Sequence, residues 1–225
     1  GINITGDFAN ATHTAFQDTP PNWGDNRFLA SMYAMTNSDA LLLGVGMELH
    51  HETVTLFFDI DPDTGSNVYP VFNGEIDGEA RAQFIGMTFD TNFTPDKAIT
   101  FTRWQAGEPD EGCHVGWHDI VREISTSWGK FEDTASPYVF TNQNVIFGFF
   151  PANDVGQTNW VHEWNLGCEL SIPFDWLGAT TNEVKIMAQI GSWAGDFVAN
   201  QTLPPVHNDP STTNSLTADR RYDLI

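Results

Sequence analysis

An apolar stretch that runs directly into a loop of alternating aspartates constrains this sequence more than any other feature. Residues 53–58 read TVTLFF, and they divide into two alternating sets, Val54, Leu56 and Phe58 against Thr53, Thr55 and Phe57. A period of two is the pattern of a β-strand that packs against a core. We therefore expect a strand here, with a turn-rich loop at its end.

The loop that follows places oxygen-bearing groups at alternate positions, as calcium sites do. The candidate ligands are Asp59, Asp61, Asp63, Gly65 and Asn67. Calcium prefers several oxygen ligands from a flexible loop. The loop is not an EF-hand, because Pro62 interrupts it and no glutamate stands at the twelfth position. We predict a calcium ion that braces the loop, and the alternative is a solvated turn rich in Asp and Gly.

Short strand patterns separated by turns continue along the chain, and no useful stretch has the period of a helix. Residues 28–35, 41–49 and 53–58 give three strands in succession, which predicts an antiparallel meander. Further strands are expected at residues 2–4, 98–104, 116–124, 138–150, 161–174, 183–193 and 221–225. About ten to twelve short strands predict an all-β fold, a two-sheet antiparallel β-sandwich that is jelly-roll-like.

The sequence predicts a single domain over residues 1–225. It contains no linker, repeat or low-complexity segment that would separate two cores. From about residue 197 the pattern weakens, and we expect an irregular tail that lies on the surface. A single helical turn is expected at 174–178, after Pro173 ends the preceding strand.

The composition excludes one class of partner and indicates a location. The chain has 30 acidic and 9 basic residues and a net charge of −21, so it repels phosphate backbones and nucleic-acid binding is not expected. Scarce lysine with abundant Thr, Asn, Gly, Trp and Phe is typical of a secreted protein, extracellular or on the cell surface. No apolar run approaches the roughly 20 residues of a membrane-spanning helix.

Two cysteines, Cys113 and Cys168, complete the composition. In an exported protein the favoured interpretation is one disulfide between them. By loop-closure entropy such a bridge would stabilise the fold by about 4 kcal/mol. The alternative is a pair of unlinked buried thiols.

Three segments together resemble a known group of domains. They are GDF followed by strand, turn, strand and LFFDIDPDTG, then HEWNLGCELSIPFDWLG, and finally GDFVANQTLPP. Their order is similar to secreted β-sandwich domains related to family 9 carbohydrate-binding modules and to the DOMON-like domains of bacterial surface proteins. The resemblance spans residues 6–205 and implies a sandwich fold, with the calcium sites of the family mapping onto residues 59–67. It transfers no sugar-binding aromatic residue.

The eight tryptophans are more than core filling needs, although several must be buried. Sugars stack on exposed aromatic rings while neighbouring polar groups orient the hydroxyls. The candidate ligand-binding residues are Trp104, His114, Trp117, His118 and Trp160. We expect Trp117, with the two histidines and Asp119, to share a face with Trp160, His162 and Glu163. A metal site at the two histidines and simple burial of the aromatic rings are the alternatives.

These features predict a secreted, non-catalytic module that binds carbohydrate or cell-surface glycan and is braced by calcium. The alternative is a structural protein, a subunit of an extracellular filament, sheath or surface layer that assembles through its terminal strands. An enzyme is not expected, because no nucleophile elbow, His-Glu-x-x-His motif or phosphate loop is present. A polysaccharide hydrolase or lyase is the minor alternative, since its chemistry needs only two neighbouring carboxylates and the chain has 30 acidic residues.

Overall fold

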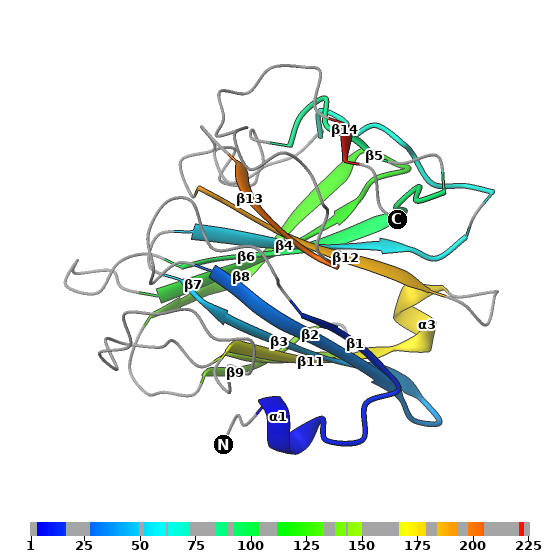
Figure 1. The fold of residues 1–225 in the computed structure, drawn as a ribbon. Coiled ribbons are helices and arrows are strands. Elements are labelled where there is room, and N and C mark those ends of the chain that lie inside the picture. The colour runs from blue at the N-terminus through cyan, green and yellow to red at the C-terminus, as the bar shows by residue number, and fades with distance from the viewer. Residues whose placement is uncertain are drawn as a thin grey trace.

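The strand patterns of the sequence form two antiparallel sheets that pack face to face (Figure 1). The computed structural model describes residues 4–16, 28–49, 52–61, 63–72, 84–89, 92–103, 112–132, 138–142, 144–149, 167–178, 184–192, 198–204 and 221–222. The predicted all-β, two-sheet sandwich is confirmed.

Sheet A contains six strands, which lie in the order β1 (His13–Phe16), β2 (Phe28–Thr36), β3 (Ala40–Glu48), β11 (Gly167–Pro173), β10 (Val145–Phe149) and β9 (Tyr138–Asn142). Sheet B contains six more, in the order β13 (Val198–Leu203), β12 (Lys185–Ser192), β4 (Glu52–Asp59), β6 (Lys97–Arg103), β7 (Gly112–Asp119) and β8 (Ile124–Glu132). A parallel pair, β5 (Thr88–Phe89) and β14 (Arg221–Tyr222), forms a separate small sheet. The described helices are single turns, α1 (Ile4–Asp7) and α3 (Phe174–Leu177).

The predicted meander is correct for β2 and β3 and wrong for the third strand. The first two strands pair antiparallel in sheet A, but β4 lies in sheet B between β12 and β6. Val45 of β3 and Val54 of β4 belong to the same buried apolar cluster. The chain therefore crosses between the sheets here, and the apolar faces of β3 and β4 contribute to the same core.

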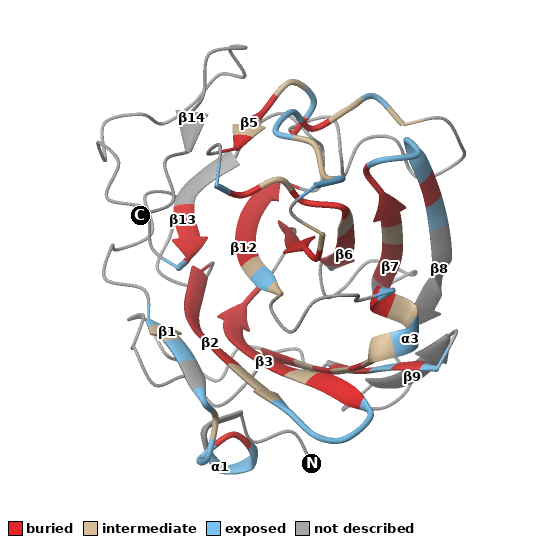
Figure 2. Ribbon diagram, turned by 90° about the vertical axis from the view of Figure 1, so that its right-hand side faces the viewer, coloured by how far each residue is buried: buried red, intermediate tan, exposed pale blue. Residues whose placement is uncertain are grey.

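Strand β4 is buried on both of its faces. Val54 and Leu56 point into the core between the sheets, as the alternation predicts. Phe57 points the other way, where its ring centroid lies 5.7 Å from that of Tyr69 and 5.0 Å from that of Phe89. A second apolar cluster therefore covers the outer face of sheet B, and Figure 2 shows how much of both sheets is buried.

The two ends of the chain differ from their predicted form. The irregular tail expected from about residue 197 contains strand β13, an edge strand of sheet B. Its Gln201 is fully buried and accepts a 3.0 Å hydrogen bond from the backbone N–H of Leu29 in β2, which ties the edge of sheet B to sheet A. At the other end, Ile4 begins α1 rather than ending a strand.

The two cysteines lie in opposite sheets. Cys168 is fully buried in β11, and Cys113 lies in β7. No disulfide is seen among the side chains that the structure describes, and that of Cys113 lies outside them. The bridge therefore stays a prediction. None of the helices in the described part of the chain is long and apolar enough to cross a membrane.

Candidate functional site

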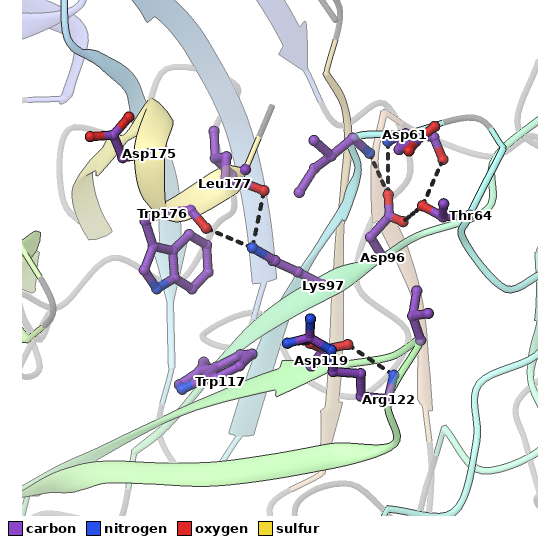
Figure 3. A pocket seen from close by; sticks show the side chains of 13 residues that line it. Asp61, Thr64, Asp96, Lys97, Trp117, Asp119, Arg122, Asp175, Trp176 and Leu177 are labelled. Atoms are coloured by element: carbon purple, nitrogen blue, oxygen red, sulfur yellow. Dashed lines mark hydrogen bonds and ion pairs between the residues drawn. The ribbon is translucent and has the colours of Figure 1, made fainter. Parts of the chain in front are cut away.

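A pocket of about 530 Å³ opens at one end of the sandwich (Figure 3). Its walls come from the start of β6, the end of β7, the loop after β4, and α3. The lining includes two tryptophans, four aspartates, one lysine and one arginine. The volume of the pocket is in the range of small-ligand sites, and its lining combines aromatic rings with charged groups.

The aromatic wall of the pocket is formed by Trp117 of β7 and Trp176 of α3. Their ring centroids are 6.0 Å apart and the ring planes meet at 75°, an edge-on contact. Both side chains are half-buried and pack against the main core, which leaves part of each ring at the pocket. Edge-on packing fixes the orientation of the two rings relative to each other.

The local sequence explains how Trp176 reaches this position. Pro173 is the last residue of β11, and its fixed φ of −58° turns the chain into α3. Gly178 ends the helix in the left-handed conformation, with φ of 69°, and donates its N–H to the Phe174 carbonyl. The predicted helical turn is confirmed, and it presents Trp176 toward sheet B.

Lys97 connects this turn to sheet B. Its Nζ donates hydrogen bonds to the carbonyl oxygens of Trp176, at 2.6 Å, and Leu177, at 3.0 Å. Burial lowers the pKa of the Lys97 ammonium from its usual value, while the charges of Asp119 and Asp96 act to raise it and Arg122 acts to lower it. Lys97 thus links β6 to α3 at the pocket.

Asp96 organises the aspartate loop from outside it. Its Oδ2 accepts hydrogen bonds from the N–H of Ile60, at 2.7 Å, and of Asp61, at 3.0 Å. Its Oδ1 accepts from the Thr64 hydroxyl at 2.7 Å. Asp96 is itself buried, so these bonds satisfy a carboxylate that would otherwise be costly to bury.

The predicted metal ligands make contacts of their own within the protein. Asp59 Oδ2 accepts from the Thr94 N–H and forms an ion pair with Lys185, and Asp61 Oδ1 accepts from the Asp63 N–H. The carbonyl of Asn67 accepts from the Phe89 N–H. Gly65 lies so close to Thr94 that an added Cβ would stand 1.5 Å from its carbonyl oxygen.

Within the described residues, no three Asp, Glu, His or Cys side chains converge where they could hold a metal ion. The carboxylates of Asp59 and Asp61 instead accept separate hydrogen bonds from the backbone. The arrangement thus offers no ready coordination shell, and calcium stays a prediction.

The histidines flanking Trp117 face away from it. His118 is fully buried on the outer side of sheet B, between the hydroxyls of Thr100, at 3.0 Å, and Ser125, at 2.6 Å. His114 lies on the same side as His118, since alternate residues of a strand share a face. The structure therefore does not place Trp117 and the two histidines on one binding face. Trp104, Trp160, His162 and Glu163 lie outside the described residues.

Several residues of the pocket are missing from the predicted binding set. They are Asp96, Lys97, Arg122, Asp175 and Trp176. Asp119, expected beside Trp117, does line the pocket with it. The turn after Pro173 could have singled out Trp176. The contact between Lys97 and Trp176 spans 79 residues, and no local pattern signals it.

Asp119 and Arg122 form the remaining wall. The carboxylate accepts the Arg122 backbone N–H at Oδ1, at 2.9 Å, and Oδ2 lies 3.5 Å from the guanidinium Nη1. The arginine side chain is 75% exposed and the aspartate 10%. This pair closes the turn between β7 and β8 and orders one edge of the pocket.

Comparison of the chain with protein-family models, with curated proteins and with solved structures gave no match. The resemblance to carbohydrate-binding and DOMON-like domains therefore stays a prediction.

Proposed function

We propose that this protein is a non-catalytic carbohydrate-binding module whose ligand lies in the pocket that Trp117 and Trp176 line. The observation that carries the proposal is the pair of half-buried indole rings in a pocket that also holds carboxylates. The C–H face of a sugar ring packs on an indole ring, and carboxylate oxygens accept hydrogen bonds from sugar hydroxyls.

Two further features support a binding role rather than catalysis. Asp96 uses both of its carboxylate oxygens to hold the loop at residues 60–64. Asp119 uses both of its oxygens on Arg122. Carboxylates that are engaged in this way order the pocket, while a general acid or base needs to reach the reacting group.

A glycan array followed by affinity electrophoresis in soluble polysaccharides tests the proposal. We expect the protein to be retarded in at least one polysaccharide, and we expect Trp176→Ala to abolish the retardation. Phe16→Ala is the matched control, because Phe16 is an aromatic residue that is 41% exposed and lies outside the pocket.

Circular dichroism and a thermal melt establish that each variant is folded before binding is compared. An array without signal, or a Trp176→Ala variant that is folded and binds like the wild type, would refute a glycan site in this pocket.

Calcium and the filament alternative are separate proposals. Calcium bound by the loop at residues 59–67 predicts a melting temperature that rises with calcium and falls with a chelator. The alternative function, a filament or surface-layer subunit that assembles through its terminal strands, predicts large particles in light scattering. A monomer with and without calcium would argue against assembly. Secretion to the cell surface likewise remains a proposal, consistent with either function.

A further inference from the structure

The acidic and basic groups of the pocket differ in number and in how many contacts they make within the protein. Four aspartates and two basic residues line it, which leaves a net formal charge of −2. Among them, only the groups whose hydrogen-bonding capacity is unused by the protein are available to a ligand. The charge that the pocket favours in a ligand therefore depends on which of these groups have unused hydrogen-bonding capacity.

Both basic side chains are engaged within the protein. The ammonium of Lys97 donates to two carbonyl oxygens and lies 4.9 Å from the centroid of the Trp176 ring. The guanidinium of Arg122 pairs with Asp119 through Nη1, at 3.5 Å, and its side chain is otherwise 75% exposed, so its charge is compensated by the aspartate and by solvent. Neither cation is positioned to give an anionic ligand a dedicated, desolvated partner.

Two of the four carboxylates are similarly engaged, and two are not. Asp96 and Asp119 bind the loop and the arginine, as described above. Asp175 is exposed on α3 and, among the described residues, has no hydrogen-bond or ion-pair partner. Asp61 Oδ1 accepts one backbone N–H, from Asp63, and its other oxygen accepts none in the described part of the chain.

The remaining capacity of the pocket is therefore negative. Figure 3 shows Asp175 and Asp61 at opposite ends of the pocket with Lys97 between them, and the Asp175 carboxylate points away from Lys97. The ammonium of Lys97 occupies the position over the Trp176 ring, so a ligand amine would pair with Asp61 or Asp175 and not with that ring. The charge of −21 on the whole chain adds attraction for cations and repulsion for anions.

We infer that the pocket discriminates sugars by charge: it favours units that carry a protonated amino group, accepts neutral units less tightly and rejects units that carry a carboxylate or sulfate. This inference rests on the proposed function, because it assigns a ligand class to the same site. An ion pair between an exposed carboxylate and a ligand amine is worth about a two- to five-fold change in affinity.

Titration calorimetry with three short oligosaccharide series tests the inference. The probes are glucosamine oligomers, the same oligomers fully N-acetylated, and galacturonic-acid oligomers, all below neutral pH where the amine is protonated. We expect the amino form to bind about two- to five-fold more tightly than the acetylated form, with a preference that weakens as salt is added. The uronate is expected to bind most weakly.

Isosteric variants locate the preference in the pocket. Asp175→Asn or Asp61→Asn should remove about two- to five-fold of the preference for the amine and leave affinity for the acetylated form nearly unchanged. Asp7→Asn is the control, since it removes the same charge from α1, outside the pocket. Its preference should match the wild type.

The outcomes separate this inference from the function on which it rests. Equal affinity for the amino and acetylated forms, tighter binding of the uronate, or a preference unaffected by both pocket variants would overturn the charge inference while leaving glycan binding intact. A preference that Asp7→Asn reduces equally would overturn it too, because the attraction would then be general. Absence of binding by all three series and by the glycan array would refute the proposed function itself.

Discussion

Lys97 and Trp176 are joined twice. The lysine Nζ donates a 2.6 Å hydrogen bond to the Trp176 carbonyl oxygen and lies 4.9 Å from the centroid of the indole ring of the same residue. Because Lys97 begins a strand of sheet B and Trp176 belongs to the turn that follows sheet A, this contact ties the two sheets together at the pocket. The shape of the aromatic wall therefore depends on one ammonium group.

Lys97→Met should loosen that wall. The methionine keeps an apolar stem but leaves two carbonyl oxygens without their donor, so we expect a loss of about 1–2 kcal/mol in the free energy of unfolding. Urea denaturation measures it. Arg122→Met is the control, because that arginine is 75% exposed and its ion pair with Asp119 should contribute less than about 1 kcal/mol. A larger loss for the control would contradict the importance of the Lys97 contact.

The lowered pKa of Lys97 predicts a pH dependence with a definite sign. Between its folded pKa and the usual value of 10.5, the folded protein binds fewer protons at this site than the unfolded chain does. The cost of burying the charge is therefore fully present below the folded pKa and is relieved as the pH rises through it. Comparing wild type with Lys97→Met cancels the contribution of the other groups.

Urea denaturation of both proteins from about pH 8 to about pH 11 measures this effect. The stability of the wild type relative to Lys97→Met should rise with pH. A difference that is constant or falls over this range would show that burial does not dominate the environment of Lys97.

Asp96→Asn should weaken the loop after β4. The amide has one acceptor oxygen where the carboxylate accepts from Ile60, Asp61 and Thr64, so at least one of these hydrogen bonds is lost or reversed. We expect a loss of about 1–3 kcal/mol in the free energy of unfolding. Asp63→Asn removes the same charge from an exposed side chain of the same loop and should stay within about 0.5 kcal/mol of the wild type.

Gly65→Ala and Gly86→Ala should destabilise the protein for different reasons. A Cβ on Gly65 meets the Thr94 carbonyl oxygen at 1.5 Å, so the backbone must move, at a cost of about 1–3 kcal/mol or more. A Cβ on Gly86 meets nothing within 4 Å, but the φ of 78° strains an alanine by about 1 kcal/mol. Thermal or urea denaturation compares them, and a larger loss for Gly86→Ala would contradict the close approach at Gly65.

The sequence predicts local structure in this protein well and long-range placement poorly. Alternation along β4 identifies its two faces correctly, because the backbone of any strand imposes a period of two. The same alternation places Trp117 and His118 on opposite faces, so their separation was within reach of the sequence. The transfer of β4 to the other sheet was not, since it depends on how the apolar faces of whole strands match across the core.

In the candidate site too, the sequence predicts local structure better than long-range contacts. The turn at Trp176 is encoded by Pro173 and Gly178, which act on their immediate neighbours. The role of Asp96 depends on a loop more than 30 residues earlier, as its hydrogen bond to Ile60 shows. An aspartate whose three acceptor contacts arise only on folding looks, in sequence, like any other polar residue before a strand.

Because β4 is buried on both faces, its position affects how the protein unfolds. The core between the sheets contains Val54 and Leu56, and the outer cluster contains Phe57 of the same strand. Disorder in either cluster would remove β4 from its place and expose the other cluster to water. The two clusters should therefore unfold cooperatively. Differential scanning calorimetry should record a single endotherm, with both clusters melting at one temperature.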